Sequence, residues 1–222
     1  GNDNNSREEG DKHNWQVWHG NIEPRVFGEP QLQDYSVEGL SFKKFKEDRT
    51  KFASEFGMHA SANLYTLQRN VPQTELVLGS AEMMNRNKDI NHLKGVMLME
   101  GYTGIPGNLE EYIDFSMLTQ AEGLKYGIEH YRRNKPETSG ALFWQFNDCW
   151  PGTSWSVIDY YGLPKAAYHY ARKFYHPLLL TAEYTPGDAE LVLWGVNDAR
   201  ETVSKTAELV VYGMDGRQVY AR

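Results

Sequence analysis

The feature that most constrains this fold is a short apolar run, residues 51–56, that carries one carboxylate near its end. Glu55 is the only acidic side chain in the run, and Gly57 follows it two positions later. A buried strand normally excludes an unpaired charge, because desolvating a carboxylate is expensive. A strand that ends in Glu-x-Gly is therefore predicted to present an anion at its tip. In α/β barrels, catalytic side chains lie at these carboxyl-terminal strand tips.

A second run, residues 140–147, reads as one continuous apolar strand. Continuous apolar strands are typical of parallel sheets that are covered on both faces. Helical patterns separate this run from the one that contains Glu55. The predicted class for this part of the chain is therefore α/β.

The longest helix is predicted over residues 108–134. Asn108 is a favourable N-cap, and Glu110 and Glu111 lie near the positive end of the helix dipole. Shorter helical stretches are predicted over residues 42–48, from Thr74 onward, over residues 84–99 and over residues 165–175.

The N-terminal segments show less order. Residues 1–13 are polar without periodicity and predict a flexible loop. Residues 14–20 predict a short aromatic strand or strand end. Residues 21–40 contain proline, glycine and acidic residues without a clear period, which predicts a long loop.

The pattern changes after residue 176. Residues 178–184, 190–197, 206–213 and 218–221 all read as strands separated by turn residues, which is typical of antiparallel β structure. We therefore divide the chain into residues 1–176 and residues 177–222. Complete barrels need about 250 residues and complete β-sandwiches about 100, so each unit is expected to be part of a domain.

Charge and composition exclude several functions. The formal net charge is −7, which disfavours a nucleic-acid partner, and no apolar run is long enough to predict a membrane helix. The one cysteine, Cys149, excludes an internal disulfide and a cysteine-based zinc cluster, and its isolation predicts a buried packing role. The histidines at 19, 59, 130 and 169 show no metal-ligand spacing, so no metal site is expected.

The chain is rich in aromatic residues, with 14 Tyr, 9 Phe and 6 Trp. Tyr and Trp combine an apolar face with a polar group, which suits carbohydrate binding. A large aromatic core is the simpler explanation of the composition taken alone.

Three motifs together resemble glycoside hydrolase family 2, in its β-mannosidase branch. They are Trp-Gln-Val-Trp-His-Gly at 15–20, Ser-Glu-Phe-Gly at 54–57 and Phe-Trp-Gln-Phe-Asn-Asp-Cys-Trp-Pro at 143–151. The third motif continues through residues 154–160, and the resemblance covers about residues 14–182. It implies the C-terminal portion of a (β/α)8 TIM barrel, followed by the beginning of an immunoglobulin-like β-sandwich.

The resemblance implies that Glu55 is the catalytic nucleophile, on strand seven of the barrel. In the family that the chain resembles, the acid/base is a glutamate preceded by asparagine. This sequence contains no Asn-Glu dipeptide. The acid/base is therefore expected in the remainder of the same polypeptide. The alternative for Glu55 is a structural carboxylate paired with a lysine or arginine.

The resemblance also implies sugar-binding residues. Trp144 would form the apolar floor under the sugar, followed by a cis peptide bond to Gln145; a core tryptophan is the alternative. Trp18 and Tyr35 are weaker candidates for the substrate pocket. Asn147 and Asp148 would either bind sugar hydroxyls or brace their loop, and bracing is favoured.

The implied activity is hydrolysis of terminal, non-reducing β-D-mannose from an oligosaccharide, with retention and without a cofactor. Two alternatives stay open. One is a related enzyme, an exo-β-glucosaminidase or β-galactosidase, and the other is a non-catalytic carbohydrate-binding or structural fragment. The substrate class favours a periplasmic, secreted or lysosomal location.

Overall fold

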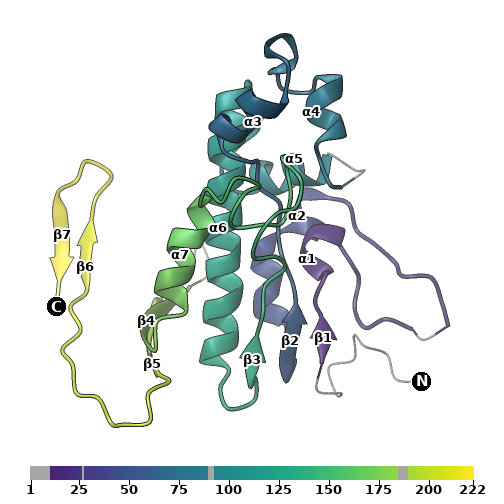
Figure 1. Cartoon of the computed structure of the whole chain (residues 1–222). Helices are drawn as coiled ribbons and strands as arrows, with labels where there is room; N and C mark the ends of the chain where they lie inside the picture. Colours follow the sequence, from purple (N-terminus) through teal and green to yellow (C-terminus); the bar gives the residue numbers. More distant parts are fainter. Residues whose placement is uncertain (1–10, 27, 90–92, 185–189) are drawn as a thin grey trace. The chain divides into compact units, whose positions relative to one another are not determined.

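The computed structural model describes residues 11–26, 28–89, 93–184 and 190–222. It divides into two compact units, one ending at Tyr175 and one beginning at His176 (Figure 1). The division falls where the sequence pattern changes from mixed α/β to antiparallel β. No helix within the described ranges is both long and apolar enough to span a membrane.

The first unit is built around a small parallel sheet. Its strands are β1 (Lys12–His13), β2 (Phe52–Glu55) and β3 (Gly140–Ala141), in the order β1-β2-β3. The three strands run in one direction, so their carboxyl ends meet at the same edge (Figure 1). This edge carries Glu55.

The strand expected over residues 140–147 is much shorter than predicted. The regular pairing of β3 ends at Ala141, and two single backbone bonds then hold the chain against β2: Leu142 N to Ala53 O at 2.8 Å and Trp144 N to Phe56 O at 2.7 Å. The apolar sequence of residues 140–147 favours an extended conformation. Regular pairing between β2 and β3 nevertheless stops after Ala141, where the chain passes over the tip of β2.

The two N-terminal predictions are wrong in part. Lys12 and His13 form β1 rather than a loop, while residues 1–10 lie outside the described residues. The expected strand at 14–20 is instead α1 (Gln16–His19), a single irregular turn. Asn14 causes the bend, because its side-chain oxygen accepts a hydrogen bond from the Gln16 backbone at 3.1 Å.

The long predicted helix is confirmed as α6 (Leu109–Arg133), with Asn108 accepting from the Glu111 backbone at 2.9 Å. It packs against η1 (Phe42–Glu47) and α7 (Ala166–Phe174), both also predicted as helical. The core between helix and sheet contains Phe45, Phe56, Leu124, Ile128 and Tyr131.

The remaining helices differ more from the sequence prediction. The helix expected from Thr74 is only a short 3-10 turn, η2 (Gln73–Glu75), and α3 (Leu64–Asn70) was not predicted. The helix expected over residues 84–99 is replaced by two: α4 (Ala81–Asn85), which begins earlier, and α5 (Leu93–Glu100). The loop predicted at 21–40 ends in one helical turn, α2 (Val37–Leu40).

The second unit consists of two antiparallel pairs. β4 (Leu178–Glu183) pairs with β5 (Val192–Asn197), and β6 (Val210–Tyr212) pairs with β7 (Gln218–Ala221). All four predicted strands are therefore present. β6 is shorter than the predicted run 206–213.

Candidate active site

Glu55 is the last residue of β2, and its side chain is 25% exposed. Its backbone oxygen accepts a hydrogen bond from Asn14 N at 2.7 Å, which ties the tip of β2 to β1. Its carboxylate Oε2 lies 3.4 Å from His13 Nδ1. Among the described residues, the basic side chain that lies against the Glu55 carboxylate is this histidine rather than a lysine or arginine. The strand tip thus presents a partly open carboxylate next to an imidazole.

His13 was not singled out from the sequence. It lies in a two-residue strand, which is too short to produce a periodic pattern. Its proximity to Glu55 results from pairing between strands that are 42 positions apart in sequence. The only sequence signal available was its position just before the aromatic motif at 15–20.

Trp144 follows β3, and its backbone lies against the segment that carries Glu55. A Cβ at Gly57 would lie 2.0 Å from the Trp144 carbonyl oxygen, so only glycine allows this approach. The predicted cis peptide bond between Trp144 and Gln145 is present. The side chain of Trp144 is 43% exposed, so one aromatic surface near the strand tips is open to solvent.

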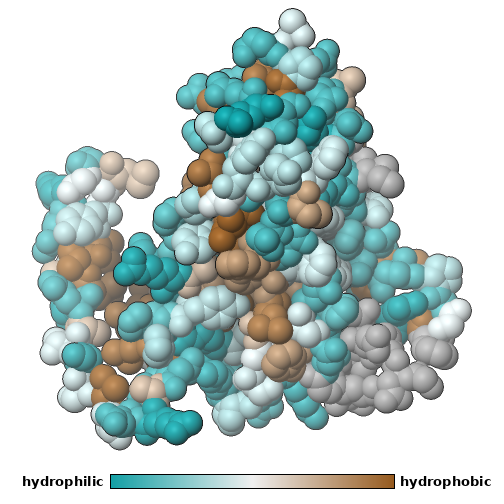
Figure 2. Space-filling model, in the orientation of Figure 1, coloured by the Kyte–Doolittle hydropathy of each residue, from teal (hydrophilic) through white to brown (hydrophobic). Residues whose placement is uncertain are grey.

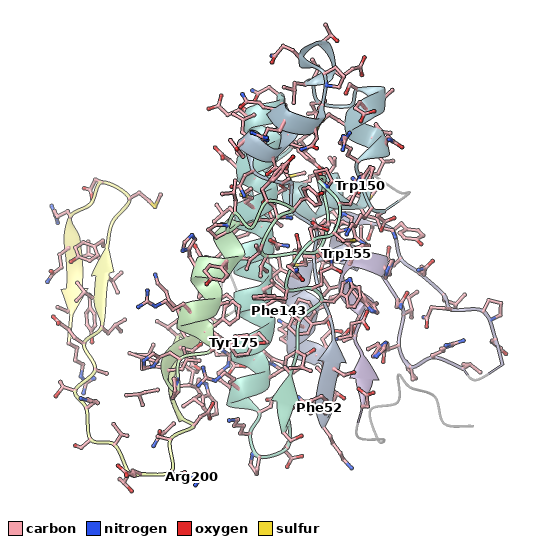
Figure 3. All side chains as sticks on the ribbon, in the orientation of Figure 1. Phe52, Phe143, Trp150, Trp155, Tyr175 and Arg200 are labelled. Carbon is pink, nitrogen blue, oxygen red and sulfur yellow. The ribbon has the colours of Figure 1, made fainter. Side chains whose placement is uncertain are left out.

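Trp144 also lines a cleft of about 510 Å³. The lining is aromatic and polar and consists of Lys88, Trp144, Gln145, Asn147, Asp148, Cys149 and Trp155. Three predicted substrate-binding residues, Trp144, Asn147 and Asp148, are therefore brought together. Figure 3 shows Trp155 and Trp150 on the segment that follows β3, and Figure 2 shows hydrophobic side chains gathered along the middle of this face of the first unit.

Asp148 braces the wall of the cleft. Its side chain is buried, forms an ion pair with Lys88 and accepts hydrogen bonds from the hydroxyls of Ser154 and Ser156. These contacts join the two ends of the segment 148–156. The bracing role that was favoured for Asp148 agrees with them, whereas Asn147 is exposed and open to a ligand.

Cys149 is exposed and borders the cleft, so the prediction that it is buried is wrong. Asp148 turns inward to Lys88, whereas Cys149 lies in the bend that follows and is exposed.

A buried lysine lies behind the cleft. Lys165 is fully buried, and its ammonium group donates to the Ala60 carbonyl at 3.0 Å. Burial lowers the pKa of Lys165 to about 8, and the nearby Asp148 and Asp159 carboxylates partly oppose this shift. Lys165 thus links the segments that follow β2 and β3.

Trp18 is placed differently from expectation, because its side chain is only 1% exposed. Its indole nitrogen donates to Asp89 at 2.7 Å, and its ring packs on His59 at a centroid distance of 4.1 Å. His59 in turn contacts Trp155, and burial lowers the pKa of His59 well below its usual value. Trp18 therefore supports the aromatic wall from behind and offers no open face within the described part of the chain.

Tyr35 is not brought to Glu55. Its hydroxyl donates to Gln33 at 2.5 Å, and the Lys94 ammonium lies 5.6 Å from its ring centroid. In the described ranges neither of these contacts reaches the strand tips. Its side chain is 43% exposed.

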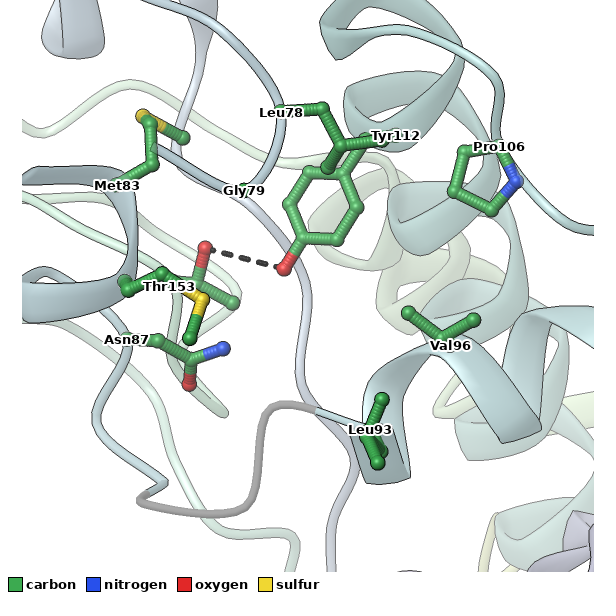
Figure 4. A pocket seen from close by; sticks show the side chains of 10 residues that line it. Leu78, Gly79, Met83, Asn87, Leu93, Val96, Pro106, Tyr112 and Thr153 are labelled. Carbon is green, nitrogen blue, oxygen red and sulfur yellow. Dashed lines mark hydrogen bonds between the residues drawn. The ribbon is translucent and has the colours of Figure 1, made fainter. Parts of the chain in front are cut away.

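A second cavity of about 460 Å³ lies among α4, α5 and α6 and is almost wholly apolar (Figure 4). Tyr112 reaches into it and donates to the Thr153 hydroxyl at 3.5 Å. Burial raises the pKa of Tyr112. None of the described residues that line the cavity carries a carboxylate. The described residues also contain no cluster suited to hold a metal ion.

Comparison with known proteins identifies relatives but no matching family model. β-Mannosidase B of Aspergillus niger is 29% identical over 231 residues, which cover 96% of this chain and 25% of the fungal protein. β-Mannosidase A of Aspergillus clavatus is 29% identical over 219 residues, covering 87% of this chain and 23% of that protein. The chain thus spans about a quarter of the length of the relatives it matches.

The solved structures agree with these relatives. The β-D-mannosidase from Dictyoglomus thermophilum has a TM-score of 0.79 and 33% identity, over 98% of this chain and 25% of that one. The exo-chitosanase of Amycolatopsis orientalis has a TM-score of 0.56 at 19% identity over 77% of this chain and 21% of that one, which shows a shared fold alone. The resemblance to the β-mannosidase branch of glycoside hydrolase family 2 is therefore confirmed.

Proposed function

We propose that this chain, the counterpart of about a quarter of a β-mannosidase, belongs to a retaining exo-glycosidase that removes terminal, non-reducing β-D-mannose. The observation that carries the proposal is a carboxylate at the tip of a parallel strand, where the residues that follow it lie against the backbone of an exposed tryptophan. Glu55 is one quarter exposed, and Gly57 lets the Trp144 backbone lie directly against its strand. This arrangement suits a charged nucleophile under a sugar ring.

The first unit would supply three adjoining strands of a (β/α)8 barrel. β1, β2 and β3 would be strands six, seven and eight, with α6 and α7 covering their outer face. The second unit would begin an immunoglobulin-like β-sandwich. Barrel enzymes carry their catalytic residues at the carboxyl ends of the strands, which is where Glu55 lies.

The proposed reaction has two displacements. A Glu55 carboxylate oxygen gives an electron pair to the anomeric carbon while the glycosidic C–O bond breaks, and the leaving oxygen takes a proton from the acid/base. Water, deprotonated by the same acid/base, then attacks the anomeric carbon and releases Glu55 as a carboxylate. Retaining enzymes hold the two carboxyl groups about 5 to 5.5 Å apart.

The remainder of the polypeptide would contribute the acid/base. The family's Asn-Glu pair is absent from these 222 residues. The apolar floor would be Trp144, and Asn147 would be available to sugar hydroxyls at the cleft. Asp148 would keep the loop in place through Lys88 and the serines at 154 and 156.

The first prediction concerns Glu55→Ala in the full-length protein. We expect turnover of a chromogenic β-mannoside to fall by about 10⁴-fold or more, because the covalent step is lost. Added azide should restore turnover and give the α-mannosyl azide, since the small anion attacks from the side that the carboxylate occupied. The product's anomeric configuration is read by NMR.

The matched control is Glu137→Ala, which removes an exposed carboxylate beyond the end of α6. It should leave turnover unchanged. A Glu55→Ala enzyme with normal turnover, or a rescued product of β configuration, contradicts the assignment of Glu55 as nucleophile. Parallel assays with β-glucosaminide and β-galactoside substrates test the alternative sugars.

A further inference from the structure

We infer that His13 is a positioning residue that orients the Glu55 carboxylate for attack, an inference that rests on the proposed role of Glu55. The two residues stand opposite each other in the parallel ladder of β1 and β2. The distance between His13 Nδ1 and Glu55 Oε2 is 3.4 Å. The contact therefore joins neighbouring strands, which hold their side chains more rigidly than loops do.

A local irregularity in the ladder creates this pairing. Lys12 stands opposite Ala53, so a regular ladder would place His13 opposite Ser54. The register shifts between Lys12 and His13, and His13 instead stands opposite Glu55. Such irregularities re-aim a side chain and are common next to active sites.

The residues on both sides of His13 are anchored in the interior. The Lys12 ammonium lies 3.4 Å from Asp48 Oδ1 and 3.1 Å from Glu23 Oε2, and the Asn14 amide donates to Asp48 Oδ2 at 2.7 Å. Lys12 and Asn14 are almost completely buried, and successive strand residues point to opposite faces. The backbone on both sides of His13 is therefore held in place, and the register shift lets the His13 ring reach the Glu55 carboxylate.

Asp48, the residue that binds both Lys12 and Asn14, is itself held by other hydrogen bonds. Asp48 Oδ2 also accepts from the Tyr131 hydroxyl at 3.0 Å, and the Asp48 carbonyl contacts His130 Nε2 at 2.7 Å. Both partners lie on α6, the longest helix of the unit. The position of His13 thus depends on the helix that supports the whole sheet.

The contact of His13 with one oxygen of the Glu55 carboxylate has two effects. It fixes the plane of the carboxylate, and it leaves the other oxygen free to approach the anomeric carbon. Contacts of this kind are often long in a free enzyme and tighten when substrate binds, which is consistent with 3.4 Å. Misplacement of a reacting group by about 1 Å can cost about 10²-fold in rate.

The test uses the full-length protein with His13→Phe, His13→Asn and, as matched control, His169→Phe. His169 is exposed on α7, where its ring contacts Tyr168. Three quantities are measured: kcat and KM on a chromogenic β-mannoside, the rate at which an activated 2-deoxy-2-fluoro-β-mannoside labels Glu55, and the thermal unfolding midpoint. Labelling is followed by the mass of the peptide that contains Glu55.

We expect His13→Phe to lower kcat and the labelling rate together by about 10²-fold, with KM changed less than about threefold. His13→Asn, whose amide nitrogen can donate to the same oxygen, should recover at least about tenfold of the loss. His169→Phe should match the wild type. The unfolding midpoint should be unchanged in all three, because the His13 side chain is 43% exposed.

Three results overturn the inference: an unchanged kcat in His13→Phe, a raised KM at constant kcat, and an Asn variant no better than the Phe variant. A raised KM alone means that His13 binds the substrate instead. The proposed function fails separately. If Glu55→Ala turns over normally, the nucleophile is wrong, whereas an inactive Glu55→Ala beside a fully active His13→Phe removes only the role of His13.

Discussion

At Gly57 the tip of β2 and the backbone that follows β3 come into direct contact. A Cβ there would lie 2.0 Å from the Trp144 carbonyl oxygen, a distance that no side chain tolerates. The opposing atom belongs to the backbone and cannot swing away. The glycine in the Ser-Glu-Phe-Gly motif therefore lets the Trp144 backbone lie against the two residues that follow Glu55.

Gly57→Ala should destabilise the protein by about 1–3 kcal/mol, because overpacking forces the two backbones apart. It should also lower kcat, since Glu55 and Trp144 would both shift. Denaturant unfolding and steady-state kinetics measure the two effects. Gly95→Ala is the matched control, because its Cβ would meet Trp18 at an ordinary 3.8 Å; an equal loss in both variants contradicts the packing argument.

Helix α6 shows which elements a sequence predicts well. Its 25 residues give many periods, and its N-cap, acidic first turn and basic last turn all agree. β1 and β3 have two residues each and give no such pattern. Short parallel strands are defined by their neighbours, so their bounds follow from pairing rather than from local preference.

Asn108→Ala should lower the free energy of unfolding by about 1 kcal/mol, because the Glu111 backbone N–H loses its cap. Denaturant melts of the purified protein measure the change. The control is Asn85→Ala at the last position of α4, which is exposed and makes no side-chain hydrogen bond within the described residues. A cap variant as stable as this control would show that tertiary packing alone holds the start of α6.

At the scale of the whole molecule, the chain corresponds to a part of its relatives. It spans about a quarter of its relatives, and its three-stranded parallel sheet has open edges at β1 and β3 in the described structure. Open edges and exposed apolar side chains are normally covered by neighbouring chain. In the proposed enzyme, the pocket would be completed by further strands and by a second carboxyl group from the rest of the polypeptide.

We expect the isolated 222-residue chain to show no turnover of a chromogenic β-mannoside, while the full-length protein is active. The reason is that retention needs two carboxyl groups, and one is proposed to lie elsewhere in the polypeptide. Circular dichroism of the isolated chain controls for folding. Measurable turnover that is lost in Glu55→Ala would place both carboxyl groups within these residues and contradict the proposal.

The amino-acid sequence by itself determined the long helix, the alternation of strands after residue 176, and the carboxylate at the end of a buried run. These features are local, because each depends on patterns within one element. Only the tertiary structure placed His13 beside Glu55, buried Trp18 behind the cleft and turned Cys149 outward. The positions of these three side chains depend on which distant segments of the chain pack against them. The residues next to them in sequence carry little information about that packing.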